Sequence, residues 1–222
     1  MVCAKSLNGQ RIEALDGLIG HVDDLYFDDS AWKVRYLVVK TGNWLLGRTV
    51  LIAPEALAKE WHGESGVAVK LTKDEICSSP DIDTAKPISR VAEQLLHHHY
   101  GWLPYWGIGI GPPSTTDVIT GLETAVATER AVVDSHLCGV KDVLGYKLFA
   151  KDGKAGQLGD LVIHEDDAKV WYLAVQLPKS GLAKTVLIRP CNVSGFDWTK
   201  KVLFSPLSCH EIEASPEYEN AA

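Results

Sequence analysis

Short apolar runs bounded by turn residues dominate the hydrophobic pattern of this chain. The run from Lys33 to Lys40 is apolar at nearly every position after Val34, which is typical of a central strand covered on both faces. The run from Arg48 to Ala53 predicts another strand, which stops at Pro54 because proline lacks the backbone donor that a ladder needs. Similar runs predict further strands over residues 18–27, 67–71, 169–177, 184–189 and 202–205. The pattern therefore predicts a mainly β protein with mostly antiparallel strands.

The turns, and one irregularity in the alternation, predict how the strands connect. Asp16-Gly17 and Asp152-Gly153 are residue types that tolerate the positive φ of a tight hairpin turn. The apolar alternation of the strand that follows slips by one step near Asp24, and again near Asp160. An extra residue at each place predicts a β-bulge, which bends a strand as the closure of a small barrel requires.

Two short helices are each predicted by a capping box. Thr72 with Glu75, and Ser208 with Glu211, have the spacing in which a hydroxyl and a carboxylate satisfy the first amides of a helix. Pro80 and Pro216, each five residues after the glutamate, limit these helices, because the residue before a proline is disfavoured in helical geometry. The chain thus predicts small β-barrels, each closed by a short helix.

The same pattern occurs twice, because an offset of 136 residues aligns the chain with itself without a gap. The matching segments are Asp16–Gly20 with Asp152–Gly156, Lys33–Val39 with Lys169–Val175, Thr49–Pro54 with Thr185–Pro190, and Glu75–Pro80 with Glu211–Pro216. Self-similarity at so long a period indicates duplicated domains and not a solenoid. Residues shared by both copies most simply maintain the shared scaffold, so function is expected where the copies differ or in the segment between them.

The repeat predicts the domain organisation. We expect one barrel over residues 1–80, a linker over residues 81–138 and a second barrel over residues 139–222. At roughly 75 residues, a barrel buries only about 60% of its chain's surface and is marginally stable alone. We therefore expect the two barrels to pack together, or on a second chain, and we expect a homodimer.

The linker combines possible helices with an aromatic, glycine-rich loop over residues 100–113. A helix can begin at the Ser89 cap, and residues 122–133 contain a second possible helix. Large aromatic side chains anchor protein interfaces, although covering a barrel end or the cleft between barrels is the more common role. The aromatic residues that we predict to bind a partner are Tyr100, Trp102, Tyr105 and Trp106.

Charge and composition exclude several classes of partner. The net charge of −7 argues against a surface that tracks phosphates, so we expect no direct nucleic-acid partner. No signal-peptide stretch and no run of about 18 apolar residues occurs, so we expect a cytoplasmic protein without membrane insertion. The five cysteines contain no C-x-x-C pair, so neither a disulfide framework nor a zinc knuckle is indicated. We expect no cofactor.

These motifs resemble those of the PRC-barrel family. The resemblance covers most of both copies and is carried by Asp-Gly-x-x-Gly, Asp-Leu, Tyr-Leu-Val-Val, the Val-Leu-Ile-x-Pro strand and the Leu-Thr-x-x-x-Ile helix start. The family includes the cytoplasmic domain of the photosynthetic reaction-centre H subunit and the C-terminal domain of a ribosome-maturation factor. The layout, with a His-Tyr-Gly-Trp and Tyr-Trp linker, is similar to bacterial proteins that carry two PRC barrels.

The chain departs from the better-known members of this family. We expect neither the membrane helix of the H subunit nor the preceding domain of the ribosome factor, so we expect neither function to transfer directly. The resemblance implies a more general role, that of an adaptor which docks on a larger protein assembly and tunes it without catalysis. We therefore expect a non-catalytic protein-binding or regulatory module.

Three adjacent histidines provide the alternative function. His97, His98 and His99 are of the residue type that commonly binds zinc, copper and nickel. Adjacent residues on a helix project in different directions, so the three cannot converge on one ion without unwinding or a second chain. A solvated or interface-lining helix end is the competing interpretation. A metal-binding protein or a metal-dependent enzyme that uses this cluster is thus the alternative to the adaptor.

Other motifs give weaker indications of a site. Gly107–Gly111 superficially resembles a phosphate loop, but Trp106 precedes it and Pro112-Pro113 follows, where a strand and a helix are needed. His136 lies near Cys138 without an established contact, and no G-x-S-x-G elbow occurs, so we expect no enzyme. Two acidic groups with a histidine can hold calcium, but solvated hairpin turns fit them better. Their members are His21, Asp23, Asp24, Asp28 and Asp29, and Asp160, His164, Glu165, Asp166 and Asp167.

Overall fold

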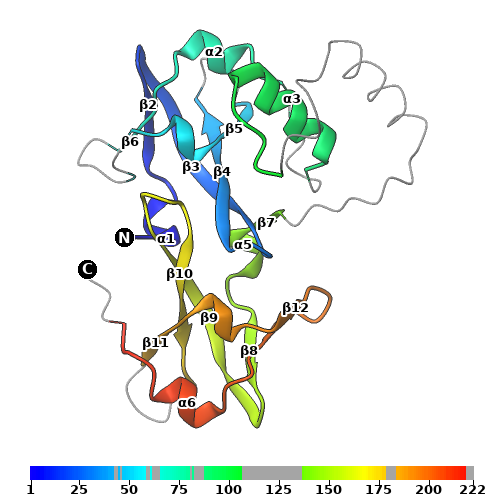
Figure 1. The fold of residues 1–222 in the computed structure, drawn as a ribbon. Coiled ribbons are helices and arrows are strands. Elements are labelled where there is room, and N and C mark those ends of the chain that lie inside the picture. Colours follow the sequence, from blue (N-terminus) through cyan, green and yellow to red (C-terminus); the bar gives the residue numbers. More distant parts are fainter. Residues whose placement is uncertain are drawn as a thin grey trace.

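Two β-sheets lie end to end in the computed structural model of the protein (Figure 1). The structure describes residues 1–42, 45, 47–58, 61, 66–80, 82, 88–106, 137–178 and 184–218. The glycine-rich motif at 107–111, the possible helix at 122–133 and His136 lie outside these residues. Below, the N-terminal unit means the described residues from 1 to 82, and the C-terminal unit means those from 137 to 218. The prediction of a mainly β protein with few helices is confirmed.

The N-terminal sheet has the strand order β5-β4-β3-β2-β6. Its two long strands, β3 (Gly17–Asp28) and β4 (Lys33–Thr41), pair antiparallel, and the apolar face of each lies in the core. β4 is buried at six of its nine positions, as its nearly continuous apolar run predicts. The shorter strands are β2 (Arg11–Ala14), β5 (Thr49–Ile52) and β6 (Val67–Ala68).

The C-terminal sheet repeats this arrangement in the order β11-β10-β9-β8-β13-β12. Its strands are β8 (Lys147–Ala150), β9 (Gly153–Ile163), β10 (Val170–Gln176), β11 (Thr185–Ile188), β12 (Gly195–Asp197) and β13 (Val202–Phe204). β5 and β11 have bounds that differ by 136 residues, and so do the short helices α2 (Lys73–Cys77) and α6 (Cys209–Glu213). The offset found in the sequence is therefore also the offset of the structural elements.

The predicted closed barrels are not found, and this part of the predicted fold is corrected. Within the described residues, the hydrogen-bonded order of each sheet has two ends and does not return on itself. Pro54 ends β5 and begins a 3-10 turn, η2 (Pro54–Ala56), while β6 is only two residues long. An isolated bridge between Leu57 and Val69 joins the segments that follow these two strands. The strands that meet there are too short to complete a ladder.

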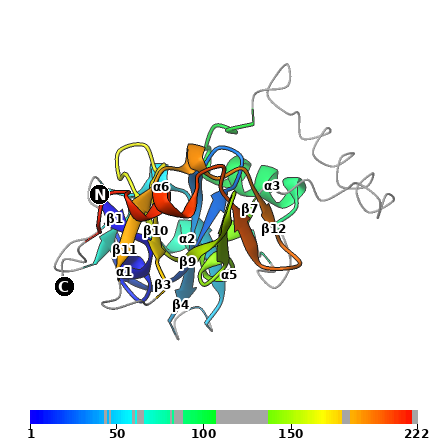
Figure 2. The same ribbon diagram turned by 90° about the horizontal axis from the view of Figure 1, so that it is seen from below.

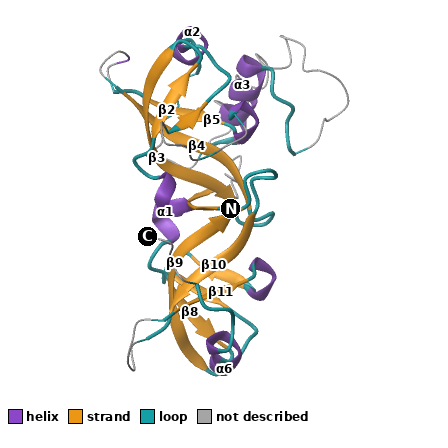
Figure 3. Ribbon diagram, turned by 90° about the vertical axis from the view of Figure 1, so that its left-hand side faces the viewer, coloured by secondary structure: helices purple, strands orange, loops and turns teal. Residues whose placement is uncertain are grey.

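Each unit lends its first strand to the sheet of the other unit, which the sequence analysis did not predict. β1 (Val2–Cys3) pairs antiparallel with β9 at Val162 and Ile163. β7 (Leu137–Gly139) pairs antiparallel with the end of β3, from Tyr26 to Asp28. Figure 3 shows the N-terminus and α1 (Ala4–Leu7) lying between the two sheets. The exchange makes each sheet a product of both halves of the chain, as in a domain-swapped dimer within one polypeptide.

The repeated Asp-Leu pair fixes this exchange. Asp160 of β9 accepts a hydrogen bond from the backbone amide of Lys5, in the first turn of α1, at 3.1 Å. Asp24 of β3 accepts one from the amide of Lys141, in the first turn of α5 (Val140–Val143), at 3.1 Å. The pairing register shifts immediately before each aspartate, so the two predicted bulges are confirmed. Each bulge turns a carboxylate toward a helix start that has no side-chain cap of its own.

A second pair of crossings lies at the turns that follow β3 and β9. The amide of Val34 donates to the carbonyl of Ala168, and the amide of Val170 donates to the carbonyl of Trp32, each at 2.8 Å. Trp32 and Ala168 both have positive φ, 49° and 58°. Like the strand exchange, these crossings are reciprocal and relate the two units by an approximate twofold arrangement.

One hydrophobic core runs through both units, joining residues such as Phe27 and Val39 to Leu161 and Leu173. The extra burial that a unit of this size needs is therefore supplied within the chain. The two predicted capping boxes are present in α2 and α6. Among the described residues, no helix is long and apolar enough to cross a membrane.

Candidate functional site

One helix covers the outer face of the N-terminal sheet. α3 (Arg90–Tyr100) begins after Ser89, whose hydroxyl accepts from the amide of Ala92 at 3.2 Å, so the predicted cap is confirmed. It ends at Gly101, whose positive φ of 67° suits glycine. The helix lies on the same flank of the molecule as β7 (Figure 2). Beneath it is a second hydrophobic cluster, made of Tyr36, Val38, Leu51, Ala53, Ile82, Ile88 and Leu96.

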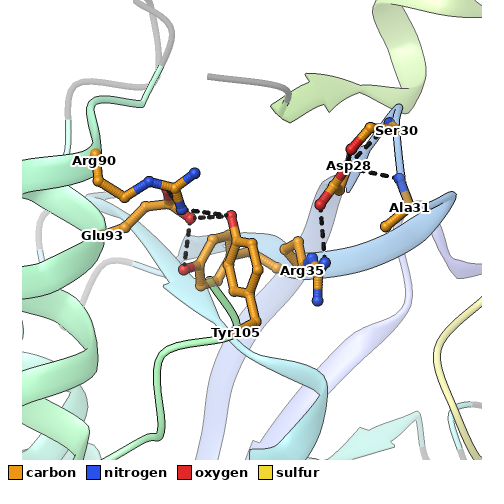
Figure 4. Close-up of polar contacts among 8 residues, drawn as sticks. Asp28, Ser30, Ala31, Arg35, Arg90, Glu93 and Tyr105 are labelled. Atoms are coloured by element: carbon orange, nitrogen blue, oxygen red, sulfur yellow. Dashed lines mark hydrogen bonds and ion pairs between the residues drawn. The ribbon is translucent and has the colours of Figure 1, made fainter. Parts of the chain in front are cut away.

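A buried carboxylate, that of Glu93, holds α3 to the sheet. Glu93 is only 1% exposed, and its Oε1 accepts hydrogen bonds from the hydroxyls of Tyr105 at 2.7 Å and Tyr36 at 3.0 Å. Nη1 of Arg90 lies 2.8 Å from the other oxygen, Oε2. Figure 4 shows Arg90, Glu93 and Tyr105 converging in this way. A buried charge is tolerated only with such pairing, because its desolvation is otherwise very costly.

This cluster of Tyr36, Arg90, Glu93 and Tyr105 is called the clamp. Its electrostatics favour stable hydrogen bonds between these side chains. Burial raises the pKa of Glu93, although the hydrogen bond from Tyr105 and the charge of Arg90 oppose the shift. Burial, together with the neighbouring carboxylate, also raises the pKa values of Tyr36 and Tyr105. Both phenols therefore stay protonated and act as hydrogen-bond donors at neutral pH. The two hydroxyl donors and the carboxylate acceptor are thus paired with one another inside the protein. This pairing fixes α3 on the sheet.

Beside the clamp, a second arginine lies under the ring of Tyr105. The guanidinium carbon of Arg35 is 3.7 Å from the centroid of the Tyr105 ring. Nη2 of Arg35 lies 2.8 Å from Oδ2 of Asp28. Asp28 also accepts from the amides of Ser30 and Ala31, the turn-stabilising role that its sequence context predicts (Figure 4). Burial opposes ionisation of Asp28, but the bonds from Ser30 and Arg35 hold its pKa below the usual value.

The three adjacent histidines occupy three different environments. His97 is buried, and its Nε2 lies 2.8 Å from the Tyr36 hydroxyl, which accepts because it donates its own proton to the buried carboxylate. Burial lowers the pKa of His97. His98 is exposed, and Nε2 of His99 donates to the carbonyl oxygen of Glu75 at 2.9 Å. Within the part of the chain that the structure describes, no group of three or more His, Cys, Asp or Glu side chains is arranged to hold a metal ion.

The four aromatic residues predicted as partner contacts are half-buried, and Tyr100 is the last residue of α3. Tyr100 stacks on Trp102 with ring centroids 4.3 Å apart, and both pack against the two hydrophobic clusters. Trp106 contacts His97 edge to face at 4.9 Å and lies under the guanidinium of Arg90 at 4.4 Å. Tyr105 belongs to the clamp, as described above. In the same segment, Leu103 is 80% exposed.

The acidic groups considered as calcium sites are engaged mainly at the joint between the units. Asp23 forms ion pairs with Lys141 at 2.9 Å and Lys40 at 3.4 Å. Glu165 lies 2.9 Å from the N-terminal ammonium of Met1. Asp24 and Asp160 cap the exchanged helices, Asp167 contacts the ring of His164, and Asp166 is almost fully exposed.

Three of the cysteines have pKa values above that of a free thiol. Burial raises the pKa of Cys138 to about 12, and it also raises the pKa of Cys3, whose thiol contacts the hydroxyl of Tyr218. Burial and the carboxylate of Asp152 raise the pKa of Cys209. A thiol is a good nucleophile only as thiolate, so these environments disfavour reaction at neutral pH.

The outer face of the C-terminal sheet has no helix over it among the described residues. Trp171 is 42% exposed and stacks on the ring of His164, with centroids 4.2 Å apart and planes 9° from parallel. Tyr172 and Leu187 are half-buried, and Arg189 is exposed. At the offset of 136, Trp171 matches Arg35, which lies under the ring of Tyr105. The other three positions match residues of the cluster beneath α3, which are Tyr36, Leu51 and Ala53. Two equivalent faces therefore differ, one covered and the other open.

Sequence reasoning identified some of these residues and missed others. The linker aromatics and His97 were singled out because they are unusual residue types in a run. Arg35, Glu93, Trp171 and Arg189 were not, although Arg35 and Trp171 occupy one repeat position with different chemistry. That difference between the copies was the available signal.

Comparison with known proteins supports part of this fold. Residues 4–73 match the family model of the PRC-barrel domain. A search of curated proteins finds no match to this chain. The chain thus contains a PRC-barrel domain in its N-terminal unit, from α1 to the start of α2.

Proposed function

We propose that this protein is a non-catalytic adaptor that docks a partner protein on the outer sheet face of its C-terminal unit. The supporting observation is the contrast between two equivalent faces: α3 and Tyr105 cover the first, whereas Trp171 and Arg189 are exposed on the second. Tryptophan and arginine are enriched at protein interfaces and among the few residues that dominate the binding energy. A regulatory role would follow if docking altered the partner's assembly.

The adaptor would consist of two PRC-type units in tandem. The family match covers only the first unit, but α1, β5 and α2 all recur 136 residues later, as α5, β11 and α6. In both units an aspartate at the same repeat position caps the exchanged helix, Asp24 in the N-terminal unit and Asp160 in the C-terminal unit. These correspondences favour a common fold for the two units.

Three further expectations remain part of the proposal. Partner binding by Tyr100, Trp102, Tyr105 and Trp106 stays a prediction, but their packing against α3 favours the C-terminal face as the main docking surface. A homodimer and a cytoplasmic location also stay predictions. The reciprocal exchange within the chain supplies burial that a second copy would otherwise provide.

Replacement of one exposed aromatic tests this function. The full chain and its Trp171→Asp variant would be used to capture partners, and each captured protein would be purified and titrated by calorimetry. We expect Trp171→Asp to weaken binding by at least about tenfold, because it removes a large apolar anchor. Gln94→Asp, at an exposed position of α3, is the matched control and should leave the affinity unchanged. Failure to find any specific protein partner would contradict the proposed function.

A further inference from the structure

The way in which the chain covers its own N-terminal face indicates what would cover the open one. We propose that the C-terminal face binds an amphipathic helix of a partner protein, which presents a carboxylate to Tyr172 and Arg189. This inference rests on the proposed function and specifies the chemistry of the partner. The covered face is the internal template for this contact.

The template is the inner surface of α3. Its residues that face the sheet recur at i, i+3, i+4 and i+7, the spacing of one helical face: Glu93, Leu96, His97 and Tyr100. The carboxylate at the first of these positions takes a proton donor from the sheet, the hydroxyl of Tyr36 at 3.0 Å. Leu96 fills the space beside that contact, within the second hydrophobic cluster. One acid and one apolar residue, a turn apart, thus dock this helix on the sheet.

The C-terminal face offers the same elements. Leu173 pairs with Ile188 in the ladder between β10 and β11, so continuing that register sets Tyr172 beside Arg189. Tyr172 matches Tyr36, and Leu187 matches Leu51, at the offset of 136. Both matched residues of the N-terminal unit lie in the cluster that α3 covers.

The open face differs from the template in one way that favours an acid. Arg189 stands where the N-terminal unit has Ala53, a buried residue under α3. Within the described residues, Arg189 makes no ion pair and the Tyr172 hydroxyl makes no hydrogen bond. An incoming carboxylate would therefore meet a neutral donor and a cation, the pair that Tyr36 and Arg90 supply to Glu93.

The C-terminal segment has a counterpart on the covered face, where it lies beside α3. The amide of Leu187 donates to the carbonyl of Pro216, and the amide of Tyr218 donates to that of Thr185, so this segment follows the outer edge of β11. Its counterpart in the N-terminal unit is Ile82, which lies in the same cluster as Leu96 of α3. Segment and helix therefore coexist on the covered face, and the same arrangement is open to the second unit.

A peptide copied from the chain itself is the probe. Residues 88–106 would be synthesised with Gln94→Glu and His98→Lys, at two exposed positions one helical turn apart. A lactam formed from these two side chains, with loss of water, would keep the peptide helical in isolation. Circular dichroism would verify the helix. Binding to the full chain would be titrated by fluorescence anisotropy, and the binding surface would be mapped by hydrogen exchange.

A double-mutant cycle decides the outcome. The changes are Glu93→Gln in the peptide and Arg189→Ala in the chain, with Arg11→Ala, exposed in the N-terminal unit, as the matched control. We expect each single change to weaken binding about tenfold, and the two together to weaken it little further, because each removes the same contact. Protection should appear in β10 and β11.

Three results would overturn the inference: a helical peptide that does not bind, additive effects of the two changes, or protection confined to β4 and β5. The last would mean that the peptide replaces α3 on its own unit. The proposed function fails separately. A natural partner that depends on Trp171 but binds equally well to the Arg189→Ala variant would preserve the adaptor and refute the acidic helix.

Discussion

At the scale of single residues, one pair of aspartates shows why a repeated motif need not mark a catalytic site. Asp24 and Asp160 each end a bulge, and each caps a helix that belongs to the other unit. The bulge was predictable because the alternation of apolar and polar residues shifts by one position near each aspartate. The cap was not, because Lys5 and Lys141 donate backbone amides, and a backbone donor leaves no residue signature in the sequence.

The ionisation of Asp24 makes stability depend on pH. Burial raises its pKa to about 6, against the amide bonds of Leu25 and Lys141, so the folded state holds this proton more tightly than the unfolded state. The cost of ionising it grows as pH rises from about 4 to about 6 and then stays constant. Asp24→Asn keeps the acceptor oxygen, so we expect it to stabilise the protein at pH 7.5 by on the order of 1 kcal/mol, a figure reduced for partial exposure.

Urea denaturation between pH 4 and pH 8 measures this effect. The gain from Asp24→Asn should shrink toward zero as the pH falls to 4. Asp23→Asn is the matched control of opposite sign: partial burial opposes ionisation there, but Lys141 and Lys40 hold the pKa below its usual value. It should lower stability slightly at pH 7.5. A stability gain for Asp24→Asn that did not vary with pH would refute the buried-acid explanation.

At the scale of elements, sequence patterns predicted the strands and helices that depend on neighbouring residues. They did not predict contacts between residues that are far apart in the chain. The strands centred on β4 and β10, both capping boxes and the start of α3 follow from short-range patterns and are present. β1 and β7 are only two and three residues long, too short for any period to be visible. Their pairing is set by the other half of the chain, and so is the burial that makes it stable. The clamp on Glu93 was missed for the same reason, since Tyr36 is 57 residues away.

The exchange predicts that damage to one unit's first strand appears in the other unit. Val2 is 4% exposed, and Val2→Asp buries an unpaired charge, so we expect a loss of about 2–4 kcal/mol. Hydrogen exchange should rise first in β9. Gly139→Ala is the reciprocal change, because a Cβ there would lie 2.7 Å from Oδ2 of Asp24 and 2.8 Å from that of Asp142. It should raise exchange first in β3. Faster exchange confined to each variant's own half would argue against the exchanged strands.

At the scale of the whole molecule, two like units form one body with two unlike faces. The continuous core, the exchanged strands and the reciprocal turns at Trp32 and Ala168 bind the units together. Such a body presents the open C-terminal face at a fixed position relative to the covered one, which is what an adaptor requires. The duplication and the mainly β class were evident from the sequence, but the asymmetry of the faces depends on how α3 packs.

Unfolding in urea, followed by hydrogen exchange in β3 and β9 separately, tests this single body most directly. Because each sheet contains a strand of the other unit, we expect both strands to lose protection at the same urea concentration and with the same m-value. Loss of protection in β9 at a clearly lower urea concentration than in β3 would mean two independent domains, and would contradict the account.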